Sequence, residues 1–192
     1  MKLFANILTW ILHPVILSIP AVYLIAYSST NDVQTSMYWT FISLIFSGLV
    51  ALFVLWGVKK KLFTNIDISN RKQRIIVYPF VVVVVSLFAI TIHLFKGPSG
   101  LIQASILFVV GLIVLDFVNS RIKASIHVGS VAAFFTGLSY MYGGAFYLLL
   151  LLIPFVAWAR VVEKKHTLPE TIVGALCGSL LTLVGIYVVQ LL

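Results

Sequence analysis

Long stretches of apolar residues limit what this chain can fold into. The first two cover residues 3–28 and 36–58. As helices they are long enough to cross a hydrocarbon core of about 30 Å. Hydrophobic residues make up 61% of the chain and charged residues only 9%, whereas soluble domains carry about 25% charged residues. A water-soluble fold is excluded, because too few polar side chains remain to cover its surface.

The apolar stretches predict seven membrane-spanning helices. The run from Val81 to Val85 would suggest a strand in a soluble protein, but a spanning segment in lipid must satisfy its own backbone, so a helix is expected there. We predict an all-α integral membrane protein, a bundle of about six to seven transmembrane helices forming one domain over residues 1–192. The predicted spans are residues 3–28, 36–58, 76–95, 100–119, 124–141, 144–159 and 170–191.

The stretch from residue 128 to residue 159 allows two interpretations. As one helix of 32 residues it would be about 48 Å long, more than a bilayer needs. The sequence Tyr140-Met141-Tyr142-Gly143-Gly144 interrupts it, and Gly-Gly is a turn signal. We therefore favour two short spans.

Basic residues are distributed very unevenly over the predicted topology. With seven spans, the N-terminus and three polar segments, residues 59–74, 119–127 and 160–170, share one side of the membrane. That side receives all the lysines and arginines except Lys96, which predicts that it faces the cytoplasm. We expect a multi-pass protein of a bacterial or archaeal plasma membrane, whose net charge of +8 reflects topology and attraction to anionic lipids, not nucleic-acid binding. The basic residues on the predicted cytoplasmic side are Lys2, Lys59, Lys60, Lys61, Arg71, Lys72, Arg74, Arg121, Lys123, Arg160, Lys164 and Lys165.

Two histidines lie in polar segments of the basic face. His127 and His166 each precede or open an apolar helix. The first turn of a helix offers unpaired N–H groups and the positive end of the helix dipole, which suit a phosphate. Together with the nearby arginines and lysines, the two histidines predict an anion site on this face.

The spacing of these residues carries a family resemblance. The third segment reads Arg160-x5-His166-x3-Glu170, and the second contains Ser125-Ile126-His127. In the first segment, Arg74 follows Asp67 by seven positions. These patterns resemble the three signatures of the type 2 phosphatidic acid phosphatase superfamily. The third segment resembles Ser-Arg-x5-His-x3-Asp, the second resembles Pro-Ser-Gly-His, and the first resembles Lys-x6-Arg-Pro.

The resemblance covers roughly residues 36–191, with residues 1–35 as an additional N-terminal span. Asp67 stands where the family has lysine, Ile126 where it has glycine, and Glu170 where it has aspartate. The proline of the first signature is absent. The number of spans between successive signatures also resembles that of the family.

The resemblance implies metal-free hydrolysis of a phosphoester. His166 would attack phosphorus and form a phosphohistidine, Glu170 would orient it, and His127 would protonate the leaving oxygen. The substrate would be a phospholipid or a polyprenyl phosphate or diphosphate, and no cofactor or metal is implied. The phosphate-binding residues would be Arg160, Arg74, Lys123, Ser125 and, as an addition, Arg71.

Each residue also has a structural interpretation. Thr167-Leu168-Pro169-Glu170 is a capping-box sequence, so Glu170 could simply start the last helix. His13 and His93 are expected to be interfacial or packed polar residues. Lys164 and Lys165 are expected to contact lipid headgroups. Gly174 and Gly178 have the spacing of close helix packing.

Other functions remain open at this point. The main alternative is a catalytically degenerate membrane protein of the same fold that binds anionic lipid. An intramembrane prenyltransferase would need two Asp-rich motifs to bind Mg²⁺, and the chain has five acidic residues and no Asp-x3-Asp. A transporter would need polar residues near the bilayer midplane, of which the chain has few. The sequence leaves the lipid and the oligomeric state open.

Overall fold

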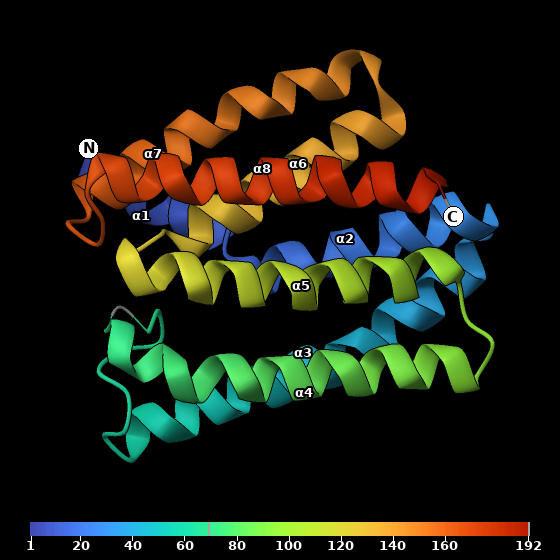
Figure 1. The fold of residues 1–192 in the computed structure, drawn as a ribbon, viewed down its shortest axis with the longest axis horizontal. Helices are drawn as coiled ribbons and strands as arrows, with labels where there is room; N and C mark the ends of the chain where they lie inside the picture. The colour runs from blue at the N-terminus through green and yellow to red at the C-terminus, as the bar shows by residue number, and fades with distance from the viewer. Residues whose placement is uncertain (69, 192) are drawn as a thin grey trace. The chain divides into compact units, whose positions relative to one another are not determined.

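The computed structural model describes residues 1–68 and 70–191. Within these ranges the chain forms eight α-helices and one 3-10 helix, and no strand (Figure 1). In chain order they are α1 (Lys2–Ile11), α2 (Pro14–Thr30), α3 (Val33–Lys59), α4 (Arg71–Leu94), α5 (Ser99–Arg121), α6 (Ile126–Tyr142), η1 (Gly144–Leu151), α7 (Leu152–Val162) and α8 (Leu168–Leu191). The predicted all-α fold is confirmed, including a helix through Val81–Val85.

Among the described residues, six segments are long and apolar enough to cross a membrane. They are Lys2–Thr30, Val33–Lys59, Arg71–Leu94, Ser99–Arg121, Gly144–Val162 and Leu168–Gln190. The remaining predicted span corresponds to α6, which has 17 residues and would be about 25 Å long. The chain is therefore a multi-pass helical membrane protein with six such segments and one shorter apolar helix.

The outward faces of the helices suit lipid better than water. On α3, Phe41, Ile45 and Leu52 are each more than 60% exposed. Three polar side chains of the same helix are buried instead, and each donates a hydrogen bond to a carbonyl of the preceding turn: Ser36 to Asp32, Thr40 to Ser36, and Ser43 to Thr40. This arrangement satisfies every one of these hydroxyls inside the helix, as a hydrocarbon environment requires.

The first predicted span contains an interruption that the sequence analysis did not anticipate. Helix α1 ends at Ile11, and α2 begins at Pro14, whose ring has no N–H to continue the helix. The carbonyl of His13 accepts from Leu17, and its Nδ1 accepts from the N–H of Val15 at 3.3 Å. His13 thus caps the start of α2.

The chain reverses direction after α6, as favoured from the Gly-Gly sequence. Gly143 and Gly144 have φ values of 61° and 51°, in the left-handed region where glycine is favoured over other residues. Figure 1 shows the chain turning there and returning alongside α6 through η1 and α7. Residues 128–159 therefore form two segments, not one. The 3-10 form of the first part of the returning segment was not predicted.

Three helices end in the same backbone motif with a lysine in the left-handed conformation. Lys61, Lys96 and Lys164 have φ values of 61°, 52° and 56°, respectively, at the ends of α3, α4 and α7. In each, the next N–H bonds to a carbonyl five residues back: Leu62 to Gly57, Gly97 to Ile92, and Lys165 to Arg160. This is the Schellman motif, in which the left-handed residue is usually glycine. A positive side chain at this end also complements the helix dipole.

The helices group into two compact units. One comprises Met1–Leu17 and Phe117–Leu192, and the other comprises Ser18–Asp116. In the second unit, Trp39, Phe88, Ile92 and Leu101 form a buried apolar cluster with Ala26. The first unit contains α1, α6, η1, α7 and α8, and it holds most of the candidate site.

Helices α6 and α8 pack together at very close range through glycines. A Cβ atom added to Gly174 would overlap the carbonyl of Ser125, and one added to Gly178 would overlap the carbonyl of Gly129. Figure 1 shows α8 running alongside α6. The Gly-x-x-x-Gly spacing of α8 therefore serves close helix packing, and it brings the first turns of the two helices together.

Candidate functional site

The turn between α7 and α8 positions the residues of the third predicted signature. Arg160 lies in the last turn of α7, is 2% exposed, and pairs through Nη1 with Glu163 Oε2 at 3.0 Å. Its carbonyl accepts from the N–H groups of Lys165 and His166 at 3.1 and 3.3 Å. The Schellman turn at the end of α7 thus fixes the backbone that leads into His166.

His166 and Glu170 form a hydrogen-bonded pair. Nδ1 of His166 lies 2.9 Å from Oε2 of Glu170, and the histidine side chain is only 4% exposed. The same carboxylate oxygen accepts from the N–H of Thr167 at 3.1 Å. The capping and orienting roles considered for Glu170 are therefore compatible, because one oxygen contacts both groups. With Nδ1 facing Glu170, Nε2 is the nitrogen that can reach a substrate.

The start of α6 lies directly against this turn. Ser125 is the N-cap of α6, is fully buried, and its Oγ accepts from Val128 at 3.5 Å. Its N–H donates to the carbonyl of Glu170 at 3.0 Å, and Nζ of Lys123 donates to the carbonyl of Lys165 at 3.1 Å. The second and third polar segments, more than 30 residues apart in the sequence, therefore meet at one end of the first unit.

His127 lies in the first turn of α6 and is buried. The ring of His13 packs edge-on against it, with centroids 4.7 Å apart and an interplanar angle of 83°. The sequence analysis expected His13 to be an interfacial or packed residue and gave it no relation to His127. The sequence His13-Pro14 was the available signal that His13 faces inward, since a polar residue at a helix break can do so. Only the packing of α1 in the first unit shows that its neighbour is His127.

The first predicted signature lies in the other unit. Arg74 is 2% exposed, and its Nε donates to the carbonyl of Ile68 at 3.2 Å. Arg71 opens α4 next to the N-cap Asn70, whose side chain accepts from Lys72. Because Arg71 and Arg74 belong to the unit of Ser18–Asp116, their part in a site with His166 stays a prediction.

The surroundings of His166 favour its neutral form. Burial lowers the pKa of His166 from its usual 6.5 to about 4, and the positive charges of Lys123 and Arg160 act in the same direction. The hydrogen bond to Glu170 opposes this change. At neutral pH the imidazole is therefore unprotonated at one nitrogen, as a nucleophile must be.

The titration of His166 can be measured directly. In full-length protein labelled with ¹⁵N-histidine, the His166 ring signals should titrate near pH 4 and show a neutral Nδ1–H tautomer above that pH. Because the Glu170 contact raises the pKa, Glu170→Gln should move the titration to lower pH. His166→Asn assigns the signals, and a midpoint near 6.5 in the wild type would contradict the buried, basic environment.

The groups at this end of the first unit suit an anion. An oriented histidine, a second histidine in a helix N-terminal turn, an arginine, a lysine and a buried serine come from the α7–α8 turn and the start of α6. Comparison with family models, curated proteins and solved structures gave no match.

Proposed function

We propose that the protein is a metal-independent phosphatase that acts on a lipid phosphate or diphosphate through a phosphohistidine. The observation that carries the proposal is the 2.9 Å contact between His166 Nδ1 and Glu170 Oε2. It holds the imidazole so that Nε2 is the attacking atom, as in other oriented nucleophile–acid pairs. The resemblance to the type 2 phosphatidic acid phosphatase superfamily implies the same role for both residues.

The reaction proceeds in two steps. In the first, the lone pair of His166 Nε2 forms a bond to phosphorus while the bond from phosphorus to the lipid oxygen breaks, and His127 gives this oxygen a proton. In the second, His127 takes a proton from a water molecule that attacks the phosphohistidine. The nitrogen–phosphorus bond breaks, inorganic phosphate leaves, and both histidines return to their starting states.

Several groups bind the phosphate oxygens in this proposal. Arg160 and Lys123 supply positive charge, and Ser125 supplies a hydroxyl close to the first turn of α6. Glu163 already offsets part of the charge of Arg160 through their 3.0 Å ion pair. For Arg74, with Arg71 as an addition, a phosphate-binding role is what the resemblance implies.

The substrate is a phosphatidate-type lipid or a polyprenyl phosphate or diphosphate. The proposed nucleophile lies between the ends of two apolar helices, α7 and α8, which suits a phosphate held at headgroup depth. We propose that this side, with its excess of positive charge, faces the cytoplasm of a bacterial or archaeal cell. Labelling of a cysteine introduced beside Arg160 by an impermeant reagent in intact cells would contradict that orientation.

A second candidate is a non-catalytic protein of the same fold that binds anionic lipid. One observation favours it: both acidic residues of the turn already have partners within the protein. Glu170 accepts from Thr167 and Glu163 pairs with Arg160, so both contacts could have a purely structural role.

Phosphate release in EDTA distinguishes the two candidates. Purified full-length protein should release phosphate from at least one member of a panel of phosphatidate, lysophosphatidate and polyprenyl phosphates and diphosphates. The rate should be unaffected by EDTA and by His93→Ala, a histidine change in the second unit. Release that requires Mg²⁺ would contradict the mechanism. No release by folded protein would favour the lipid-binding candidate.

A further inference from the structure

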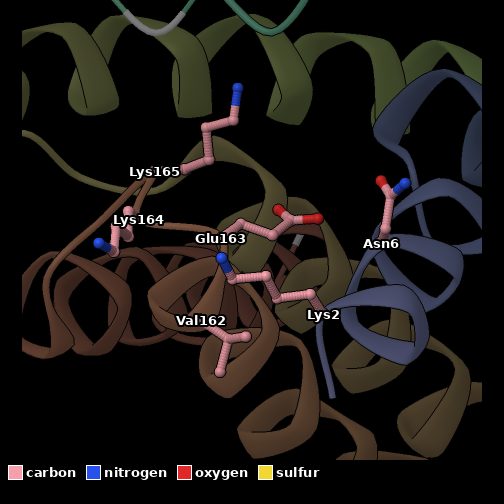
Figure 2. A pocket seen from close by; sticks show the side chains of 6 residues that line it. All are labelled: Lys2, Asn6, Val162, Glu163, Lys164 and Lys165. Carbon is pink, nitrogen blue, oxygen red and sulfur yellow. The ribbon is translucent and has the colours of Figure 1, made fainter.

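An open surface pocket lies beside the candidate site, between the start of α1 and the end of α7. Its volume is about 340 Å³, and it is lined by Lys2, Asn6, Val162, Glu163, Lys164 and Lys165. In Figure 2 the Lys2 side chain reaches from α1 toward the end of α7, while Lys164 and Lys165 extend from the rim in different directions. The volume falls in the range of small-ligand sites, about 300–1,000 Å³.

The charge of the pocket favours an anion. Lys2, Lys164 and Lys165 contribute three ammonium groups from two separate segments. The only acidic lining residue, Glu163, already accepts a hydrogen bond from Arg160 at 3.0 Å. The amide of Asn6 adds hydrogen-bond donors. A phosphate group would therefore lie among positive side chains and meet no uncompensated negative charge.

The surface next to the pocket favours a lipid over a soluble anion. On α1, Leu3, Phe4 and Ile7 are 74%, 58% and 48% exposed, and on α7, Phe155 is 53% exposed. Phe4 also packs against Trp158, which holds α1 and α7 together just beyond the lysines. An acyl chain can follow these apolar side chains while its headgroup occupies the basic pocket.

We propose that this pocket binds the phosphate group of an anionic membrane phospholipid. None of the lining residues is assigned a catalytic or phosphate-binding role above, and the proposal does not rest on phosphatase activity. The left-handed lysine at the end of α7 does not by itself indicate a site, because Lys61 and Lys96 occupy the same position of the same motif. What distinguishes Lys164 is its place in the lining of the pocket.

The repeated motif supplies a matched pair of variants. Lys164→Gly removes a pocket charge and places glycine where the backbone favours it, so the fold is retained. Lys2→Gln removes a positive charge from the first turn of α1. The helix dipole disfavours a positive charge at that end, so the fold is retained here as well. The control is Lys61→Gly with Lys96→Gly, which removes two charges from equivalent helix ends outside the pocket.

Native mass spectrometry of full-length protein in neutral detergent, titrated with phosphatidylglycerol, tests the proposal. The wild type should bind one molecule more tightly than any further ones, and more tightly than phosphatidylcholine. Lys2→Gln with Lys164→Gly should weaken this first binding about fivefold or more, since each lysine near a headgroup has an effect of that order. The control pair should leave it unchanged.

Three results would overturn the proposal. An equal loss of affinity in the control pair would mean that the lipid is attracted to positive charge in general and not to this pocket. Equally tight first binding of phosphatidylcholine, whose headgroup has no net charge, would mean that the net negative charge of the lipid is not recognised. Displacement of the lipid by inorganic phosphate at similar concentration would identify a free anion as the ligand. The His166→Ala variant should bind the lipid as tightly as the wild type. A failure of the lipid-binding proposal can therefore be distinguished from a failure of the phosphatase proposal.

Discussion

Replacement of His166 with alanine is expected to abolish phosphate release, with a loss on the order of 10⁴-fold or more. The imidazole would supply the bond to phosphorus, and alanine has no atom that can take over that role. The cap of α8 should survive, because Glu170 still accepts from the N–H of Thr167. Initial rates in detergent micelles measure the loss, and circular dichroism with size-exclusion chromatography verifies the fold.

Replacement of His127 with alanine should give a different defect. The nucleophile remains, but the leaving oxygen loses its proton donor, which typically slows such a step by about 10²–10⁴-fold. A substrate with a nitrophenyl leaving group needs no proton, so its first step should be nearly as fast as in the wild type. Labelled phosphate should then accumulate on the protein in His127→Ala and be absent in His166→Ala.

These two variants assign separate roles to the histidines. Equal losses in the rate of the first step of His127→Ala on lipid and nitrophenyl substrates would exclude a general-acid role. A His166→Ala protein that still hydrolyses its substrate would exclude the phosphohistidine.

A methyl group added at Gly178 should destabilise the protein strongly. The new Cβ would overlap the backbone carbonyl of Gly129, which cannot move without shifting α6. Overpacking of side chains costs about 1–3 kcal/mol, and a clash with backbone should lie at the upper end. Denaturant unfolding of Gly178→Ala in detergent measures the effect. Gly174→Ala should act similarly and also reduce activity, because its Cβ would displace Ser125.

The same helix pair contains the control for this prediction. A Cβ added to Gly137 of α6 would lie 3.8 Å from the Thr182 methyl group, an ordinary contact. Gly137→Ala should therefore leave stability unchanged or raise it slightly, since alanine favours the helix. If Gly178→Ala were as stable as Gly137→Ala, the close approach of α6 and α8 would be wrong.

The helical fold was predictable because lipid leaves few alternatives. Apolar length alone located the spans, and Gly143-Gly144 located the reversal within residues 128–159. The interruption at His13 was missed because Pro14 is compatible with a helix in a membrane, and only the observed backbone shows that α1 ends before it. The lysines at the helix ends were missed because the motif usually carries glycine.

The local part of the site was easier to predict than the rest. His166 and Glu170 are four residues apart at the start of a helix, so their contact follows from helical spacing. The contact of Ser125 with Glu170 depends on how closely α6 approaches α8, and the contact of His13 with His127 depends on where α1 packs. Such distant contacts have no signature in a single sequence.

One oxygen of Glu170 contacts both His166 and Thr167, so the orientation of His166 depends on the local unfolding equilibrium of the first turn of α8. Helix ends open and close at low free-energy cost compared with the helix interior. When the first turn of α8 opens, Glu170 leaves Thr167 and His166 in the same event. The fraction of molecules with an aligned imidazole then equals the fraction with an intact helix start. Any lipid, ion or substitution that stabilises that turn would raise the population of competent molecules without touching the histidine.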